Sequence, residues 1–284
     1  PTAIEHESVL QSVDELEKQG FEVIRLMPDK QGRITEQQVF DAVNSDTILV
    51  SMMYVNNEVG SIMPVKSIKK AVKRANAPAL IHIDCVQAFG KLEVKPSKLG
   101  ADLVTVTAHK IHGPKGVGAL YLKKGTRILP RVFGGEQEKK LRPGTEAIPL
   151  IAGFGVAADL IPDLKKQSEK IKEINTYAKE GLLSVPGVKI NSGDDASDYI
   201  INLFVPTFMT SQTVVQHLSS KYGVYVSNGS ACAKGKRSHV LTAMKLDDKI
   251  IEKSIRVSFS RTTTKGDIDE FVNAIKETVV QYPM

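Results

Sequence analysis

The sequence is poor in cysteine and contains none of the long apolar runs that mark membrane proteins. Its two cysteines stand at unrelated positions and make no disulfide framework, so we expect a reducing compartment and a cytoplasmic location. No apolar run approaches the ~20 residues that a membrane helix needs. No internal repeat and no signal peptide is recognisable, although an incomplete N-terminus would hide the latter. These absences predict a globular protein that does not enter a membrane.

The composition and charge are those of an ordinary globular protein. Hydrophobic residues make up 42% of the sequence and charged residues 25%, and the formal net charge of +6 is mild. The densest basic run, Lys66 to Arg74, has helical spacing with Val65, Ile68 and Val72 on the opposite face. We interpret it as a solvated helix and expect no direct contact with nucleic acid. Binding of an acidic acceptor or of tRNA is the less favoured alternative.

Apolar patterns of helix and strand period alternate along the first half of the chain. This alternation predicts repeated βα units and a mostly parallel sheet. A helical pattern over 148–183 exceeds ordinary helix lengths and contains Pro162, so we expect a break and a link between two domains. The predicted helices are 8–19, one from the Thr35 cap, 65–75, 213–221 and 267–279, and the predicted strands are 21–26, 47–52, 79–83, 102–107, 188–190, 199–204, 224–227 and 255–260.

Lys110 follows the predicted strand 102–107 and precedes a turn rich in glycine. Strand ends deliver side chains into the crevice of an α/β sheet, where ligands bind. A lysine that bonds to a carbonyl cofactor needs desolvation or a neighbouring cation, and His109 and Lys115 are candidate neighbours. The alternative is a solvated lysine, because most lysines are exposed.

Asp84 ends the buried run 79–83, and Gln87 follows three residues later. A carboxylate at this position suits pyridoxal phosphate, because it keeps the pyridine nitrogen protonated and makes the ring an electron sink. The alternative is the N-cap of a following helix. Asp84 and Lys110 together favour the cofactor more strongly than either residue alone.

Cys232 lies among small and basic residues in the segment SNGSACAKGKR, and the positive charge would favour its thiolate. A phosphate-binding P-loop is a less favoured alternative. Five residues, rather than four, separate Gly229 from Gly235, and an arginine replaces the Ser or Thr that would bind magnesium. We interpret the other cysteine, Cys85, as a small buried hydrophobic residue.

With these segments the chain resembles the cysteine desulfurases, pyridoxal-phosphate enzymes that take sulfur from L-cysteine and leave L-alanine. The resemblance covers nearly the whole sequence through the motifs AIEHESVL, VNNEVG, HIDCVQ, TAHKIHGPKGVGALY, GGEQEKKLRPGT, SNGSACA and SIRVSFSR. The motif SNGSACA is similar to the active-site loop of the family branch that serves iron–sulfur cluster assembly and tRNA thiolation. The resemblance implies the α/β fold of PLP-dependent transferases of fold type I. A large domain, 1–157, would hold a mostly parallel sheet, and a smaller α+β domain, 158–284, would carry the cysteine.

The resemblance also implies a role for each matched residue. The catalytic set would be Lys110, which binds the cofactor aldehyde and moves the substrate α-proton, Cys232, which takes the sulfur as a persulfide, and His6, which stacks on the ring. Arg256 would clamp the substrate carboxylate, with Asn57 beside the substrate. The cofactor would be held by Asp84 at its ring nitrogen, Asn57 and Gln87 around its phenolic oxygen, Thr107 and His109 at its phosphate, and Thr145 at the phosphate of the other subunit of a homodimer. No metal ligand is predicted.

Some of these assignments have plainer alternatives. His6 precedes a predicted helix and would be an exposed residue there, and Asn57 suits turn chemistry. Arg256 is harder to dismiss, because a charge on the inner face of a strand is costly without a partner. His217 and His239 are interpreted as helix residues without a role.

The chain opens at PTAIEH, where the resemblance places a preceding segment with a Gly/Thr-rich loop that holds the cofactor phosphate. We therefore expect a truncated chain that binds pyridoxal phosphate poorly. One function is a homodimeric desulfurase that passes sulfur to an iron–sulfur scaffold or a tRNA thiolation enzyme. The alternative is a catalytically silent scaffold or sulfur-carrier module. An aminotransferase or selenocysteine lyase would share Lys110 and Asp84, but Cys232 favours desulfuration over transamination, which needs no thiol.

Overall fold

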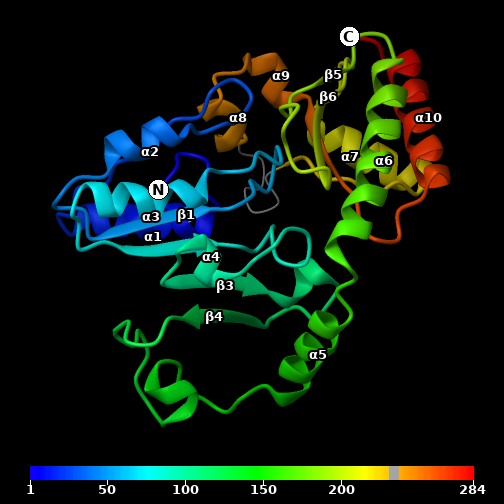
Figure 1. Ribbon diagram of the computed structural model, residues 1–284. Helices are drawn as coiled ribbons and strands as arrows, with labels where there is room; N and C mark the ends of the chain where they lie inside the picture. Colours follow the sequence, from blue (N-terminus) through cyan, green and yellow to red (C-terminus); the bar gives the residue numbers. More distant parts are fainter. Residues whose placement is uncertain (230–236) are drawn as a thin grey trace. The chain divides into compact units, whose positions relative to one another are not determined.

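The computed structural model describes residues 1–229 and 237–284 (Figure 1). The chain forms two compact units, each assembled from segments that are far apart in the sequence. The predicted assignment of 1–157 and 158–284 to two domains stays a prediction. The first unit comprises Pro1–Ala42, Met52–Pro64 and Lys165–Met284, and the second comprises Val43–Ser51 and Val65–Leu164.

A four-stranded sheet of order β1-β2-β3-β4 lies mainly in the second unit. β2 and β3 are parallel, as the alternating pattern predicts, and β4 is an antiparallel edge strand that the pattern did not predict. The α/β fold is therefore confirmed, with a mixed sheet. The strands are β1 (Leu49–Met53), β2 (Leu80–Asp84), β3 (Leu103–Thr107) and β4 (Gly118–Leu122).

The helices of the second unit confirm two predictions. α3 buries Val65, Ile68 and Ala71 and leaves its lysines on the other face, as expected of a solvated basic helix. The long helical pattern breaks around Pro162, because proline has no N–H to donate and ends α5 before α6 begins. These elements are α3 (Val65–Arg74), α4 (Pro96–Leu99), the 3-10 turns η1 (Ala108–Ile111) and η2 (Gln137–Lys140), α5 (Ile148–Asp159) and α6 (Leu164–Leu183), which continues into the first unit.

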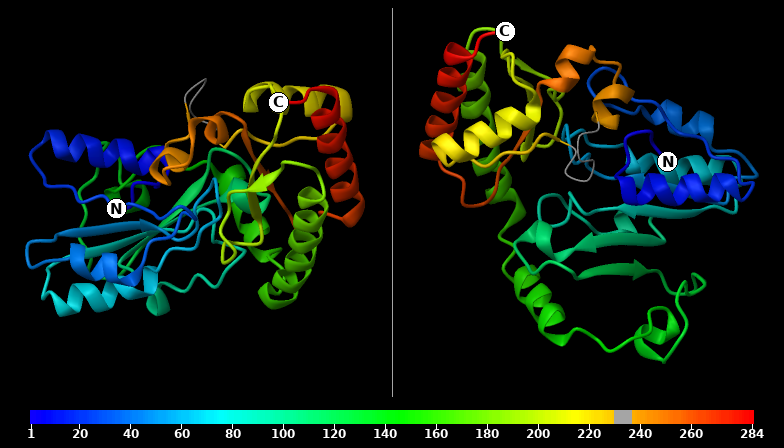
Figure 2. Two further views of the ribbon diagram at one scale, coloured as in Figure 1. Left: turned by 90° about the horizontal axis from the view of Figure 1, so that it is seen from above. Right: turned by 180° about the vertical axis from the view of Figure 1, so that it is seen from behind.

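The first unit contains an antiparallel sheet of order β5-β6-β7. Every residue of β6 is buried, because α6, α7 and α10 pack with the sheet in one apolar core. α6 and α10 lie side by side (Figure 2, green and red), joined by an ion pair between Glu173 and Lys265. The elements are α1 (Glu7–Lys18), α2 (Glu36–Ala42), β5 (Lys189–Ile190), β6 (Ile200–Phe204), α7 (Ser211–Tyr222), α8 (His239–Ala243), α9 (Asp248–Glu252), β7 (Ser254–Ser258) and α10 (Lys265–Gln281).

Two predicted strands, 21–26 and 224–227, are wrong. In each segment only the last residue pairs with another stretch of the chain, as an isolated bridge from Leu26 to Thr2 and from Ser227 to Arg256. A strand needs a continuous ladder of hydrogen bonds, and apolar alternation alone does not supply the partner. Within residues 1–229 and 237–284, no helix has the length and apolar character that a membrane crossing requires.

Candidate active site

Five of the predicted site residues lie at or just after the carboxyl ends of β2 and β3. Asp84 ends β2 and Gln87 follows it, while Thr107 ends β3 and His109 and Lys110 lie in η1. The two strands are parallel neighbours, with Asp84 opposite Thr105. Parallel strands end at the same edge of a sheet, so these side chains are brought to one edge, where open α/β sheets bind their ligands.

Asp84 is a buried carboxylate in a fixed orientation. Its Oδ1 accepts a hydrogen bond from the backbone N–H of Val86 at 2.8 Å, so Asp84 caps the turn that follows β2. The helix that the alternative interpretation expected after Asp84 is replaced by this turn. Gln87 lies in the same turn, is buried, and accepts from Lys91 at 3.2 Å. The predicted role of both residues at a cofactor ring stays a prediction.

Thr107, His109 and Lys110 form a polar group after β3. The Thr107 hydroxyl lies 2.9 Å from His109 Nδ1 and 3.2 Å from the carbonyl oxygen of Val117. Desolvation lowers the pKa of His109, and the positive charges of Lys110 and Lys115 lower it further. The hydroxyl of Thr107 and the imidazole of His109 are donors that suit a phosphate group.

His82 joins three neighbouring strands and was missed by the sequence analysis. Its Nδ1 lies 2.8 Å from the Ser51 hydroxyl of β1, and its Nε2 lies 3.2 Å from the Thr105 hydroxyl of β3. Burial lowers the pKa of His82, although the nearby Asp84 carboxylate opposes that shift. A neutral imidazole has one donor and one acceptor nitrogen, so it satisfies one hydroxyl on each side.

In the first unit, Asn57 and Arg256 are in direct contact. Arg256 Nη1 donates to the backbone carbonyl of Asn57 at 2.8 Å. Arg256 Nε and Asn57 Oδ1 are buried and have no hydrogen-bond partner among the described residues. Burial lowers the pKa of Arg256, and the Glu58 carboxyl opposes this shift. Buried polar atoms normally have partners, so these two atoms mark a place where a polar ligand would bind.

His6 caps the helix α1. Its Nδ1 accepts from the backbone N–H of Ser8 at 3.2 Å and lies 2.9 Å from the Ser8 hydroxyl. His6 is half-buried, so the plainer expectation of an exposed residue before the helix is not met. Since Nδ1 accepts a hydrogen bond, the neutral ring carries its proton on Nε2. Its predicted stacking on a cofactor ring stays a prediction.

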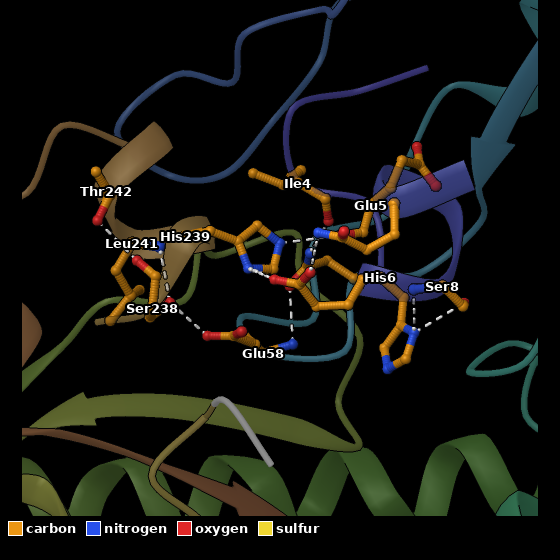
Figure 3. A network of polar contacts seen from close by, with 12 residues as sticks. Ile4, Glu5, His6, Ser8, Glu58, Ser238, His239, Leu241 and Thr242 are labelled. Atoms are coloured by element: carbon orange, nitrogen blue, oxygen red, sulfur yellow. Dashed lines mark hydrogen bonds and ion pairs between the residues drawn. The ribbon is translucent and has the colours of Figure 1, made fainter. Parts of the chain in front are cut away.

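A polar network around Glu58 was also missed by the sequence analysis (Figure 3). Glu58 is 1% exposed, and the Ser238 hydroxyl donates to its Oε2 at 2.5 Å. His239 Nε2 donates to the backbone carbonyl of Glu5 at 2.9 Å. Burial raises the pKa of Glu58, and the Ser238 hydrogen bond together with His239, Arg256 and His6 opposes this shift. The motif VNNEVG contains Glu58, but no spacing in the sequence links it to Ser238.

The two cysteines differ. Cys85 is fully buried, and burial raises its thiol pKa to about 12, which confirms that it is a small hydrophobic residue. Cys232, the predicted sulfur acceptor, lies outside the described residues. Thr145, the residue predicted to reach a second subunit, is exposed.

The aminotransferase class-V family matches residues 1–271, and the chain therefore belongs to this family. Within it, the chain is a cysteine desulfurase relative. It is 37% identical over 282 residues to cysteine desulfurase IscS of Methanosarcina thermophila, which covers 98% of this chain and 69% of the relative. It is 36% identical to cysteine desulfurase 2 of Trichormus variabilis over 98% of this chain and 70% of the relative.

Two solved structures share the fold. A NifS-like protein superposes with a TM-score of 0.90 at 34% identity, covering 99% of this chain and 74% of that structure. A NifS-like protein from Rickettsia africae gives a TM-score of 0.86 at 30% identity, covering 98% of this chain and 74% of that structure. The predicted α/β fold and the predicted family are therefore both confirmed.

We predict that His82→Gln makes the protein less sensitive to acid. A histidine whose pKa is lowered by folding binds its proton more readily in the unfolded chain. Its contribution to stability is complete above about pH 6.5 and is lost as the pH falls towards the lower folded pKa. The free energy of unfolding, measured in urea between pH 8 and pH 5, should change less steeply with pH in His82→Gln than in the wild type. The difference in slope should be at most ~1.4 kcal/mol per pH unit.

Ser51→Ala is the matched control for this prediction. It removes one hydrogen-bond partner of His82 but keeps the titrating group, so the acid-dependent slope should remain. An unchanged slope in His82→Gln would contradict the proposed burial effect.

Proposed function

We propose that this protein is a pyridoxal-phosphate-dependent cysteine desulfurase that removes sulfur from L-cysteine, leaves L-alanine, and supplies iron–sulfur cluster or thio-tRNA synthesis. The observation that carries the proposal is the placement of Asp84 and the segment from Thr107 to Lys110 at one edge of the sheet. Membership of the cysteine desulfurase family supports it.

The residues at this edge fit the cofactor by their chemistry. Pyridoxal phosphate, when bound, supplies an electron sink for the electron pair of the substrate Cα–H bond. Asp84 would hold a proton at the ring nitrogen, and Gln87 would donate to the phenolic oxygen. Thr107 and His109 would donate to the phosphate. Lys110 would hold the aldehyde carbon and move the α-proton through its amine. His6 would stack on the ring, and Thr145 would reach the phosphate of a second subunit.

The substrate carboxylate would bind at Arg256 and Asn57. Arg256 Nε, which has no partner in the described part of the chain, would supply a donor, and the guanidinium is already oriented by its bond to the Asn57 carbonyl. A planar guanidinium binds a carboxylate through two parallel hydrogen bonds, which fixes the orientation of the amino acid.

Cys232 would be the sulfur acceptor. The chain has only one other cysteine, and the buried Cys85 with its raised pKa stays a protonated, inaccessible thiol. The Cys232 thiolate would attack the substrate sulfur. A sulfur–sulfur bond would form as the carbon–sulfur bond of the substrate breaks, and the persulfide would pass to an acceptor protein.

A homodimer is part of this proposal. Large apolar side chains of the second unit stay exposed in the single chain, among them Leu129, Phe133 and Ile148, with exposed fractions of 88%, 85% and 64%. Large contiguous apolar patches mark association surfaces, and these side chains would contribute to such a patch. A second copy of the chain is the occupant that the resemblance implies.

We predict that Lys110→Ala abolishes the violet absorbance of lysine-bound cofactor and stops alanine release. Lys115→Ala is the matched control, since Lys115 is a neighbouring cation of His109 but lies beyond η1. It should keep the absorbance and most of the activity. Borohydride reduction followed by peptide mass spectrometry should place the cofactor on Lys110, and cofactor found on Lys115 would refute the assignment.

We predict that Arg256→Lys weakens recognition of the substrate carboxylate. Loss of a bidentate, charge-assisted contact should lower kcat/KM for L-cysteine by roughly 10- to 100-fold. Cysteamine, which lacks the carboxylate, is the matched substrate and should be affected far less. If both substrates lost the same factor, Arg256 would not bind the carboxylate.

A further inference from the structure

Glu58 lies in a turn that the rest of the first unit holds rigidly. Asn56 Oδ1 accepts from the backbone N–H groups of Glu58 and Val59 at 2.8 and 2.9 Å. Asn56 Nδ2 donates to the carbonyl oxygen of Ile4 at 2.8 Å. The backbone of Glu58 is therefore fixed, and its buried side chain starts from a defined position.

The Glu58 carboxyl group meets two residues that are close together in the sequence. On one side, the Ser238 hydroxyl donates to Oε2 at 2.5 Å, a length typical of a hydrogen bond to a charged oxygen. On the other side, Gly229 packs so closely that a Cβ there would lie 2.9 Å from the same oxygen. Gly229 also has a φ of +86°, which glycine adopts without strain. The Glu58 carboxyl group thus packs against Gly229, which directly precedes residues 230–236, and binds Ser238, which follows Arg237 on the other side.

Ser238 also caps a helix, and this second hydrogen bond restricts its position further. It is the N-cap of α8, and its hydroxyl oxygen accepts from the backbone N–H of Leu241 at 3.1 Å. The same hydroxyl therefore donates to Glu58 and accepts from the helix. The next residue, His239, donates to the Glu5 carbonyl, directly before His6 (Figure 3). The start of α8 is tied to both the Glu58 turn and the His6 segment.

Burial raises the pKa of the Glu58 carboxyl group, and the hydrogen bond from Ser238 and the neighbouring ionisable groups oppose that shift. The groups that face it are His239 on α8, Arg256 on β7 and His6 before α1. Arg256 also binds the carbonyl of Asn57, the residue next to Glu58. The carboxyl group is thus placed between the substrate-binding pair and the start of α8.

We propose that Glu58 is a positioning residue, whose carboxyl group fastens Gly229 and Ser238 to the turn that carries Asn57. This inference rests on the proposed function, in which Cys232 lies between those two anchors in the sequence and attacks a substrate held by Arg256 and Asn57. A single buried group then fixes both Gly229 and Ser238 relative to the substrate-binding pair. Glu58 itself touches neither the substrate nor the cofactor in this proposal.

The first experiment measures how firmly the two anchors, Gly229 and Ser238, are held. It needs neither the cofactor nor the substrate L-cysteine. Trypsin cleaves after Lys234, Lys236 and Arg237, which lie between the anchors in the sequence. Glu58→Gln keeps the shape of the side chain but replaces the carboxyl acceptor of the Ser238 hydrogen bond with a neutral amide, and it should speed cleavage about fivefold. Ser238→Ala removes the bond and the helix cap, and it should speed cleavage roughly tenfold or more.

Thr242→Val is the matched control. Thr242 lies one turn further along, and its hydroxyl donates to the Ser238 backbone carbonyl at 2.8 Å without a bond to Glu58. It should leave the cleavage rate within about twofold of the wild type, because local opening that does not release the anchors gives trypsin no new access. Equal acceleration in Thr242→Val would show general loosening of α8 and overturn the proposal.

The second experiment uses the cofactor-loaded enzyme. Glu58→Gln should lower kcat for alanine release about fivefold, leave KM for L-cysteine within about twofold, and leave the cofactor absorbance unchanged. A structural role alone would lower the melting temperature without this division between kcat and KM. Unchanged cleavage in both Glu58→Gln and Ser238→Ala, or faster cleavage with an unchanged kcat, would overturn the proposal.

A failure of the proposed function can be distinguished from a failure of the proposal about Glu58. Cys232→Ala should abolish alanine release if Cys232 is the sulfur acceptor, whatever the role of Glu58. If Cys232→Ala released alanine at the wild-type rate, the proposed function would fall. The proteolysis result would still decide whether Glu58 holds the two anchors.

Discussion

The parallel pairing of β2 with β3 is the constraint on which the proposed chemistry depends. It sets Asp84 opposite Thr105, and so brings the acid at the end of one strand and the lysine after the other to the same edge. A shift of the register by one residue would turn Asp84 to the opposite face of the sheet. His82, bonded to Ser51 and Thr105 on the two neighbouring strands, resists such a shift from inside the sheet.

In the first unit, the main feature is a pair of ionisable side chains that are removed from water. Glu58 and Arg256 are both largely removed from water, and each lowers the cost of burying the other. Hydrogen bonds from Ser238 to Glu58 and from Arg256 to Asn57 take up part of the remaining polar capacity. Arg256 Nε has no hydrogen-bond partner among residues 1–229 and 237–284, and we propose that it serves the substrate carboxylate.

The sequence predicts this fold well where local patterns decide it. The Thr35 cap, the break at Pro162 and the buried run before Asp84 each reflect local chemistry, and the structure contains all three. It fails where a distant partner decides the outcome, as at 21–26, whose alternating residues find a bridge only at Leu26. Glu58 and Ser238 were missed for the same reason, since their hydrogen bond joins residues 180 positions apart.

The proposed transfer of sulfur from L-cysteine to Cys232 can be tested by looking for the transferred sulfur atom on the protein. Cofactor-loaded protein is mixed with one equivalent of L-cysteine, quenched with an alkylating agent and digested for mass spectrometry. We expect one added sulfur atom on the peptide that contains Cys232, and none on the peptide of the buried Cys85. Alanine released without added sulfur on Cys232, or sulfur found on Cys85, would contradict it.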